Sequence, residues 1–202
     1  DMIALDLSRI DLAELQHDPF EYIVIQSFID PESLDAINRD FPPIDSPRNI
    51  ALEELEYGGA FGSLVDAVKS PEFEKKISRK FGVNIVGKPL DVSVRRFSEI
   101  TEGDIHTDAV RKVITVLIYF NKTWPHKEGR LRLLRSATDM EDYSEEIAPE
   151  KGNLVAFKRN DWSFHGLRPF EGERRAIQFS WIAPKKVSTL KKIKRLLGLK
   201  KS

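Results

Sequence analysis

A chain of 202 residues with 41% hydrophobic content fits one large all-β or mixed domain better than two small ones. Its 32 basic and 32 acidic residues cancel, so bulk charge gives no reason to expect a nucleic-acid partner. Because the chain has no cysteine, disulfides and thiolate zinc sites are excluded, and any metal must be held by His, Asp or Glu.

No targeting signal or membrane-spanning helix is expected from the sequence. No stretch approaches the roughly 18 apolar residues that a membrane-spanning helix needs. The N-terminus has no basic region followed by an apolar run, so no secretory signal peptide is expected. Met2, which follows Asp1, is expected to be the natural start, and the expected compartment is the cytoplasm.

The first part of the chain is predicted to hold a strand and two helical segments. Tyr22–Ile25 is a short apolar run typical of a buried strand. Residues 30–41 are predicted to form a helix, because an Asp-Pro pair supplies its N-cap and first residue and a Pro-Pro pair ends it. Residues 44–62, rich in Pro, Ser and Gly, are predicted to be a surface loop. Residues 63–80 have helical spacing, with a break near Pro71.

After Gly82 the sequence changes to short β-like segments separated by turn residues. They lie at 91–97, 113–120, 130–134, 153–157 and 175–181. Such a pattern is typical of a sandwich or barrel, and helices followed by strands indicate an α+β chain whose helices brace one sheet. We therefore predict one domain over 1–184, helical to about residue 82 and β-rich from about 83, with an acidic loop at 136–150.

Two of the four histidines have neighbours that suggest a metal site. In a strand, His106 and Asp108 would point to the same face, so both could bind one ion. His165 follows the apolar run at 154–157 and could come from a different strand of the same sheet. Two His and one carboxylate leave three coordination positions open, the arrangement of non-haem iron(II) oxygenases. Alone, however, His-x-Asp is a weak signal, and a histidine after a strand is more often structural or exposed.

The segment after His165 strengthens the metal hypothesis. A connection with Pro and Gly leads to a strand that begins at Arg174, nine residues past the histidine. If the two strands pair as a hairpin, Arg174 lies beside the metal on the inner face. A guanidinium there could hold a carboxylate through two parallel hydrogen bonds, as a dicarboxylate that chelates iron through its other end requires.

Strand alternation favours Arg174 over its neighbour Arg175 for this role. Arg174 shares a face with small or polar residues that leave room for a ligand: Ala176, Gln178 and Ser180. Arg175 shares a face with bulky apolar residues expected to pack against the helices: Ile177, Phe179 and Trp181. The opposite assignment, with the apolar set facing the barrel interior, stays open.

The order His-x-Asp, a distant His and an Arg nine residues later resembles the 2-oxoglutarate/Fe(II)-dependent dioxygenase superfamily, most of all its prolyl-hydroxylase-like branch. The resemblance runs from about 91 to 181 and is strongest in 113–124, 129–133 and 151–157. Residues 19–42 are also similar to the N-terminal part of small bacterial members. The resemblance implies a double-stranded β-helix, or jelly-roll, core.

The resemblance also implies roles for individual residues. His106, Asp108 and His165 match the Fe(II) ligands, and Arg174 matches the residue that binds the distal carboxylate of 2-oxoglutarate. Tyr119 matches a tyrosine that hydrogen-bonds this carboxylate in some members, although a core tyrosine is an equal alternative. The remaining residues expected to line the cosubstrate pocket are Thr115, Leu117 and Leu131.

The implied enzyme is a 2-oxoglutarate-dependent dioxygenase, a hydroxylase that uses Fe(II), 2-oxoglutarate and dioxygen to oxidise a substrate C–H bond. Many relatives place Tyr about ten residues before the first iron histidine, where this chain has Arg96 and Phe97. A small metabolite or saccharide substrate is therefore favoured, with a protein prolyl hydroxylase as the alternative. Two other hypotheses are a zinc hydrolase with the same ligands, which leaves Arg174 unexplained, and a non-catalytic jelly-roll binding module.

Two surface features complete the expectations. The loops at 44–62 and 136–150 are expected to frame the entrance, since lids come from insertions between core strands. Arginines near the inferred core also admit an anionic substrate: Arg95, Arg96, Arg130, Arg132 and Arg168.

The segment 185–202 carries eight Lys or Arg and no acid, with apolar residues at helical spacing. We expect a basic amphipathic helix that contacts anionic lipid peripherally at the inner face of the membrane. The alternative is that its apolar stripe packs on the domain, and co-sedimentation of full-length and truncated chains with anionic liposomes would separate the two.

Overall fold

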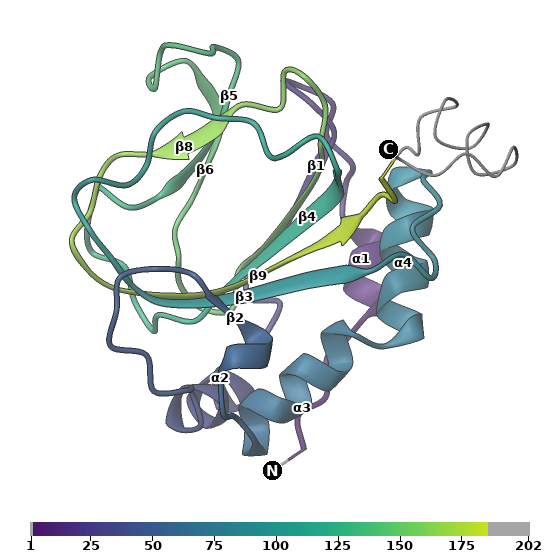
Figure 1. Ribbon diagram of the computed structural model, residues 1–202, viewed down its shortest axis with the longest axis vertical. Helices are drawn as coiled ribbons and strands as arrows, with labels where there is room; N and C mark the ends of the chain where they lie inside the picture. Colours follow the sequence, from purple (N-terminus) through teal and green to yellow (C-terminus); the bar gives the residue numbers. More distant parts are fainter. Residues whose placement is uncertain (1, 186–202) are drawn as a thin grey trace, which may run out of the picture.

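The larger of two antiparallel sheets has the strand order β1-β7-β4-β9-β3-β2 in this computed structural model, which describes residues 2–185. Its strands are β1 (Tyr22–Ile25), β2 (Ile50–Ala51), β3 (Leu90–Ser98), β4 (Lys112–Tyr119), β7 (Leu154–Lys158) and β9 (Gly172–Ile182). The smaller sheet has the order β6-β5-β8, from β5 (Leu131–Leu134), β6 (Tyr143–Ile147) and β8 (His165–Leu167). Figure 1 shows the smaller sheet on one side of the larger and the helices on the other.

The helices come mainly from the first part of the chain. They are α1 (Ser8–Leu12), α2 (Pro31–Arg39), the 3-10 helix η1 (Leu52–Glu54), α3 (Gly59–Val68) and α4 (Pro71–Phe81). Asp30 caps α2 by accepting a hydrogen bond from Ser33 N at 2.9 Å, and Ser70 caps α4 in the same way. The predicted strand at 22–25, the helix from residue 31 and the break at Pro71 are confirmed.

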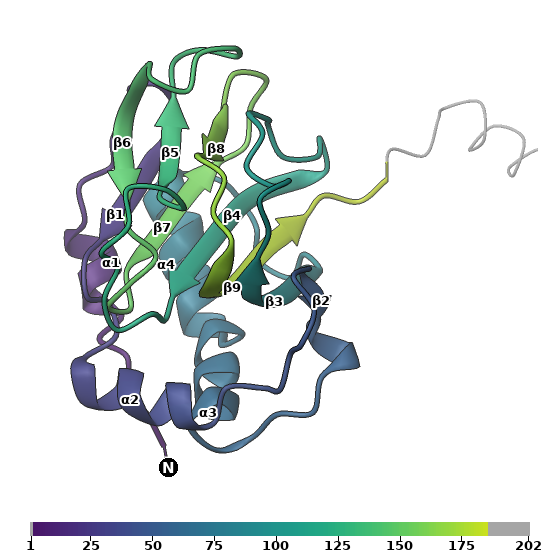
Figure 2. The same cartoon turned by 90° about the vertical axis from the view of Figure 1, so that its left-hand side faces the viewer.

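Two apolar layers lie on opposite faces of the larger sheet. Phe179 and Trp181 of β9 pack on the helix side, where the ring of Phe73 in α4 lies 5.6 Å from that of Phe179. Tyr119 and Ala176 point the other way, into the space between the sheets, where Leu131 of β5 meets them. Figure 2 shows the small sheet in front of the large one. The β9 face with Ile177, Phe179 and Trp181 therefore packs against helices and not in the barrel interior.

Two segments predicted to be loops contain regular structure. The segment 136–150 holds β6, an edge strand whose Glu146 pairs with Arg132 of β5 and whose Ile147 is buried, so its acidic residues hid the strand pattern. The segment 44–62 holds β2, η1 and the start of α3. The N-terminal amide of Ala60 in α3 donates to the carboxylate of Asp40, 20 residues earlier, which local sequence patterns do not reveal.

Two further expectations concern membrane-spanning helices and the C-terminal segment. Among the described residues, no helix is long and apolar enough to cross a bilayer. The basic amphipathic helix expected at 185–202 lies outside the described residues beyond Lys185, so it stays a prediction.

Replacing Phe73 should test the packing between α4 and the larger sheet. Phe73→Ala should lower the free energy of unfolding by about 3–5 kcal/mol, because the buried ring leaves a cavity against Phe179 and Trp181. Val86, which is 51% exposed, provides the control, and Val86→Ala should change stability by less than about 0.5 kcal/mol. Chemical denaturation measures both, and equal small losses would contradict the packing.

Candidate metal centre

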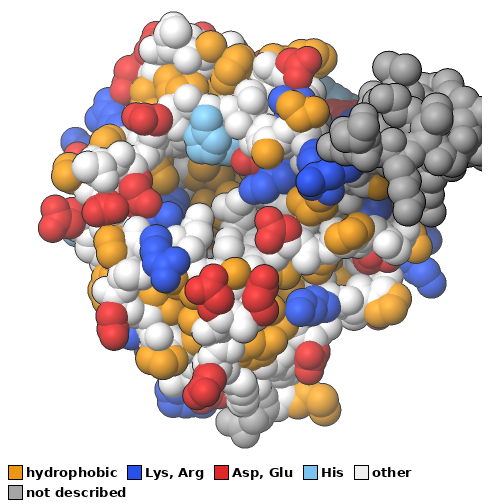
Figure 3. Space-filling view, viewed as in Figure 1, with side chains coloured by type: hydrophobic (Ala, Val, Ile, Leu, Met, Phe, Trp, Pro, Cys, Tyr) orange, Lys and Arg blue, Asp and Glu red, His pale blue; other side chains and the backbone are white. Residues whose placement is uncertain are grey.

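A cavity of about 590 Å³ opens between the inner face of the larger sheet, the smaller sheet and the loop that joins β3 to β4. Figure 3 shows the surface hollowed beside a histidine side chain, with acidic and basic side chains around the rim. All eight residues that the sequence marked as site candidates line this cavity: His106, Asp108, Thr115, Leu117, Tyr119, Leu131, His165 and Arg174.

Three of these residues form a compact cluster of metal-ligand atoms. One atom each from His106, Asp108 and His165 lies within 4.8 Å of the others. The backbones of the two histidines join them as a β-bridge, with His106 N donating to His165 O at 3.0 Å and His165 N donating to His106 O at 2.9 Å. This bridge brings together residues far apart in the sequence.

The backbone arrangement corrects two expectations. His106 and Asp108 do not lie in a regular strand, because they belong to the loop before β4, where only His106 forms a single bridge. His165 lies on β8 of the smaller sheet, which pairs with β5. β8 and β9 do not form the expected hairpin, since β9 pairs with β3 and β4. Arg174 therefore reaches the cavity from the opposite sheet.

Both imidazoles are oriented by backbone carbonyls. Nδ1 of His106 lies 2.8 Å from Asp104 O, and Nδ1 of His165 lies 2.9 Å from Ser163 O. Because a carbonyl only accepts hydrogen bonds, each Nδ1 carries a proton, and Nε2 is the nitrogen of each ring that is left for a metal.

Asp108 is a buried carboxyl that stays charged. Burial disfavours its charge, but the hydrogen bond and charge of His165 outweigh this and hold the pKa of Asp108 well below its usual range. Nearby Lys112 and the Thr115 hydroxyl act in the same direction. The carboxylate is therefore ionised at neutral pH, as a metal ligand must be.

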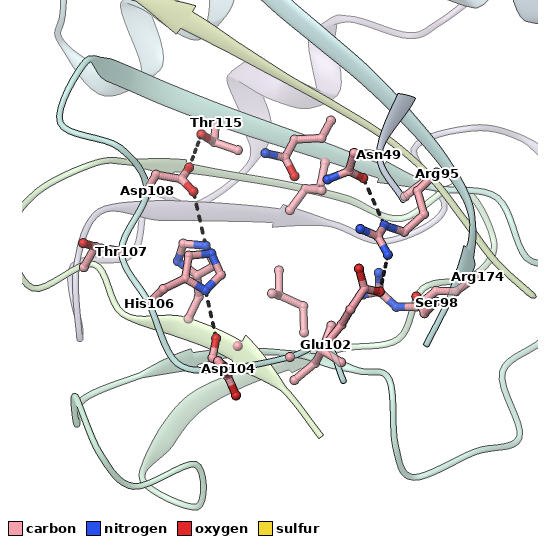
Figure 4. Close-up of a pocket in the computed structure, with 18 of the residues that line it drawn as sticks. Asn49, Arg95, Ser98, Glu102, Asp104, His106, Thr107, Asp108, Thr115 and Arg174 are labelled. Atoms are coloured by element: carbon pink, nitrogen blue, oxygen red, sulfur yellow. Dashed lines mark hydrogen bonds and ion pairs between the residues drawn. The ribbon is translucent and has the colours of Figure 1, made fainter. Parts of the chain in front are cut away.

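Thr115 orients this carboxylate. Its hydroxyl donates to Asp108 Oδ2 (Figure 4). The same hydroxyl lies 2.9 Å from Ser180 Oγ. Oδ1 of Asp108 lies 3.6 Å from His165 Nε2 and is the oxygen turned toward the cluster. Sequence reasoning gave Thr115 only a place in the pocket wall, whereas the structure also places it next to Asp108 as an orienting partner.

Arg174 extends into the buried part of the cavity. Its side chain is 6% exposed, its Nε donates to Gly129 O at 2.8 Å, and its guanidinium carbon lies 5.1 Å from the centre of the Tyr119 ring. No acidic residue of the described chain forms an ion pair with it. Burial raises the pKa of Tyr119, although Arg174 opposes the shift, so its hydroxyl is neutral and able to donate.

Arg175 points to the other face of the sheet. Its Nη1 donates to Asn38 Oδ1 at 3.0 Å, its Nε donates to Glu173, and its guanidinium lies over Phe41. Arg175 thus has partners on the helix side and lies outside the cavity that contains Arg174.

The wall opposite the metal cluster was anticipated only in part, because sequence reasoning placed Arg95 near the core and the loop at 44–62 at the entrance but missed Glu102. Arg95 lines it, donating to Asn49 Oδ1 at 3.0 Å and pairing with Glu102 (Figure 4). Asn49 comes from the loop at 44–62, which was expected at the entrance. The acidic segment 136–150 was expected there too, but none of its residues lines the cavity, and the loop at 98–109 takes that place. A lone Arg, Asn or Glu carries no sequence signal, because only their long-range contacts bring these residues together.

Comparisons with known proteins place the site in context. Residues 93–183 match the sequence model of the 2OG-Fe(II) oxygenase superfamily. A search of curated proteins found no match.

Similar solved structures include a Pseudomonas putida prolyl-4-hydroxylase, 16% identical, with a TM-score of 0.58 over 91% of this chain and 99% of that one. HygX from Streptomyces hygroscopicus, with nickel and 2-oxoglutarate bound, is 11% identical, with a TM-score of 0.58 over 90% and 88%. A Trichoplax adhaerens prolyl hydroxylase in complex with a hypoxia-inducible-factor peptide is 16% identical, with a TM-score of 0.55 over 97% and 92%. These likenesses establish a shared fold and confirm the expected combination of helices with a jelly-roll core of antiparallel sheets.

Removing the Thr115 hydroxyl should weaken metal binding without unfolding the protein. Thr115→Val leaves Asp108 Oδ2 without its donor, and loss of such an orienting partner lowers metal affinity about 10–100-fold. Titration with Mn(II) or Fe(II) measures the change. Thr107→Val, which alters a hydroxyl lining the same cavity, is the matched control and should bind metal like the unmodified protein. Equal affinity in both variants would show that Thr115 does not orient the ligand.

Proposed function

We propose that the chain is a 2-oxoglutarate-dependent dioxygenase in which His106, Asp108 and His165 hold Fe(II), because residues 93–183 match the sequence model of the 2OG-Fe(II) oxygenase superfamily. We further propose that Arg174 binds the distal carboxylate of 2-oxoglutarate. Two imidazoles and one carboxylate are a donor set suited to iron(II), and three ligands leave positions for cosubstrate and dioxygen.

One observation carries this proposal: a buried guanidinium without an acidic partner faces the same cavity as the metal cluster. A buried charge is costly unless it is paired, so an anion is expected at Arg174 when the site is filled. A dicarboxylate that spans from the metal to Arg174 meets this requirement. A zinc hydrolase would leave Arg174 without a role, and a non-catalytic binding module would leave both the arginine and the metal cluster without one.

The surrounding side chains have separable tasks. Bound iron would supply dioxygen activation and the oxidative decarboxylation of 2-oxoglutarate, chemistry that amino-acid side chains do not provide. Tyr119, kept neutral, can donate a hydrogen bond to the carboxylate that Arg174 holds. Leu117 and Leu131 also line the cavity, where their apolar side chains would exclude water from a chelated cosubstrate.

A small metabolite or a saccharide is the substrate class that we propose. Support comes from the wall across the cavity from the metal cluster, where Asn49, Arg95 and Glu102 offer amide, guanidinium and carboxylate groups. Such groups suit hydroxyl-rich or polar ligands better than a proline ring. Arg95 is already paired with Glu102, which argues against a purely anionic substrate. A prolyl substrate is the second candidate, because the similar structures include prolyl hydroxylases.

Two proposals concern parts of the chain outside the cavity. The N-terminal helices are proposed to brace the larger sheet, supported by the contact of Phe73 with Phe179 and Trp181. The basic segment 185–202 is proposed to contact anionic membrane surfaces from the cytoplasm, supported by its eight basic residues and its apolar residues at helical spacing.

Turnover of 2-oxoglutarate tests the proposed activity directly. With Fe(II) and dioxygen, the protein should slowly convert 2-oxoglutarate to succinate even without a second substrate. Asp108→Ala should abolish this turnover and metal-dependent 2-oxoglutarate binding, because the only carboxylate of the cluster is lost. Asp66→Ala, on the exposed face of α3, is the control and should turn over normally. Normal succinate release by Asp108→Ala would show that the metal ligands are wrongly assigned.

The two adjacent arginines provide a second test. Arg174→Ala should weaken 2-oxoglutarate binding by about 2–5 kcal/mol, because the distal carboxylate loses a buried partner. Arg175→Ala should leave the affinity nearly unchanged, since Arg175 contacts Asn38 and Glu173 on the other face of the sheet. Calorimetric titration of the Mn(II)-loaded variants distinguishes them. A greater loss in Arg175→Ala would reverse the assignment.

A further inference from the structure

Three hydrogen-bonding groups of Arg174 are divided between the protein and the cavity. Nε donates to Gly129 O at 2.8 Å, whereas Nη1 and Nη2 pair with no acidic group among the described residues and have only the Tyr119 hydroxyl as a side-chain partner. A guanidinium can grip a carboxylate through Nε and one Nη, or through both Nη atoms. Because Gly129 occupies Nε, only the edge formed by the two Nη atoms remains for a ligand.

The position of the Gly129 carbonyl is fixed by two aromatic residues. Gly129 has φ +76°, and a Cβ added there would lie 2.6 Å from Trp124 Cζ2 and 3.0 Å from Phe170 Cβ. The rings of Trp124 and Phe170 lie 4.6 Å apart, and Gly129 N donates to Arg168 O at 2.9 Å. No side chain other than hydrogen fits at residue 129 without displacing this segment.

Trp124 is itself held in place. Its ring is buried, and its Nε1 donates to Glu128 O at 2.9 Å, which closes the loop between β4 and β5 upon itself. The Trp124 amide donates to the Glu150 carboxylate, so the loop is also tied to the segment before β7. The Gly129 carbonyl that accepts from Arg174 thus belongs to a well-anchored loop, and neither Trp124 nor Gly129 lines the cavity.

We propose that Trp124 and Gly129 are positioning residues for the cosubstrate: together they select which edge of the Arg174 guanidinium faces the cavity and so set the affinity for 2-oxoglutarate. This inference rests on the proposed role of Arg174. It assigns a functional role to the loop between β4 and β5, although neither residue lines the cavity or contacts the metal cluster.

A pair of ligands separates positioning from general damage. Both 2-oxoglutarate and oxalate can chelate a metal ion, but only 2-oxoglutarate carries a distal carboxylate for Arg174. Calorimetric titration of Mn(II)-loaded protein should show Gly129→Ala binding 2-oxoglutarate about tenfold or more weakly, since small misplacements of a binding group have effects of this size or greater. Oxalate affinity should stay unchanged in the same variant.

Gly152 offers a matched control for the strain of adding a Cβ. It has φ +67°, and a Cβ there would lie 2.6 Å from Ile29 Cβ, in a segment that does not line the cavity. Gly152→Ala should lower the melting temperature as Gly129→Ala does, yet keep the ratio of 2-oxoglutarate to oxalate affinity. The same shift of this ratio in both glycine variants would overturn the inference.

Variants of Trp124 carry the test if Gly129→Ala does not fold. Trp124→Phe keeps a ring beside Gly129 and should retain most of the affinity, whereas Trp124→Ala removes it and should lose 2-oxoglutarate affinity selectively. Equal 2-oxoglutarate affinity in both, or an equal loss of oxalate affinity, would refute positioning. Arg174→Ala separates the two levels of the proposal. If Arg174→Ala binds 2-oxoglutarate with normal affinity, the proposed role of Arg174 is wrong. If Arg174→Ala loses affinity but Gly129→Ala and Trp124→Ala bind 2-oxoglutarate normally, only the positioning inference is wrong.

Discussion

The pleat of β4 and β9 is the constraint on which the rest of the structure depends. Along β4, Ile114, Val116 and Ile118 face the helices, while Thr115, Leu117 and Tyr119 face the cavity. Because side chains alternate with a period of two, a slip of one residue would exchange these sets and place apolar groups at the metal cluster. The hydrophobic layer under the helices therefore fixes the register that presents the polar residues, and core and site are specified by the same pattern.

Much of the fold could be predicted because its signals are local. The Asp30-Pro31 pair caps and begins α2, Pro71 begins α4, and alternating or continuous apolar runs mark the central strands. The choice of Arg174 over Arg175 followed from alternation alone, and the structure places the two on opposite faces of the sheet. The candidate metal residues needed more than local pattern. His106, Asp108 and His165 acquired meaning through their order and spacing relative to Arg174, which resembled a known family.

What could not be predicted depends on contacts between distant residues. The amide of Ala60 is capped by Asp40, and β6 forms an acidic edge strand because Glu146 finds Arg132 on β5. The expected hairpin between β8 and β9 was wrong, because the jelly-roll topology sends successive strands to different sheets. Arg95 became part of the cavity wall only through partners at Asn49 and Glu102. Such pairings are decided by tertiary structure, and single-residue propensities contain no information about them.

The proposed ligands differ in how accessible they are to water. Asp108 and His165 are buried, whereas His106 is exposed on the loop that joins β3 to β4. An ion held here would thus have a closed side, formed by Asp108 and His165, and an open side at His106. Contacts that anchor the loop include the pairing of Glu102 with Arg95 and the backbone bridge to His165. The kinetics of metal exchange would therefore follow the local opening of this loop and not global unfolding, which makes a chelator a probe of one loop's motion.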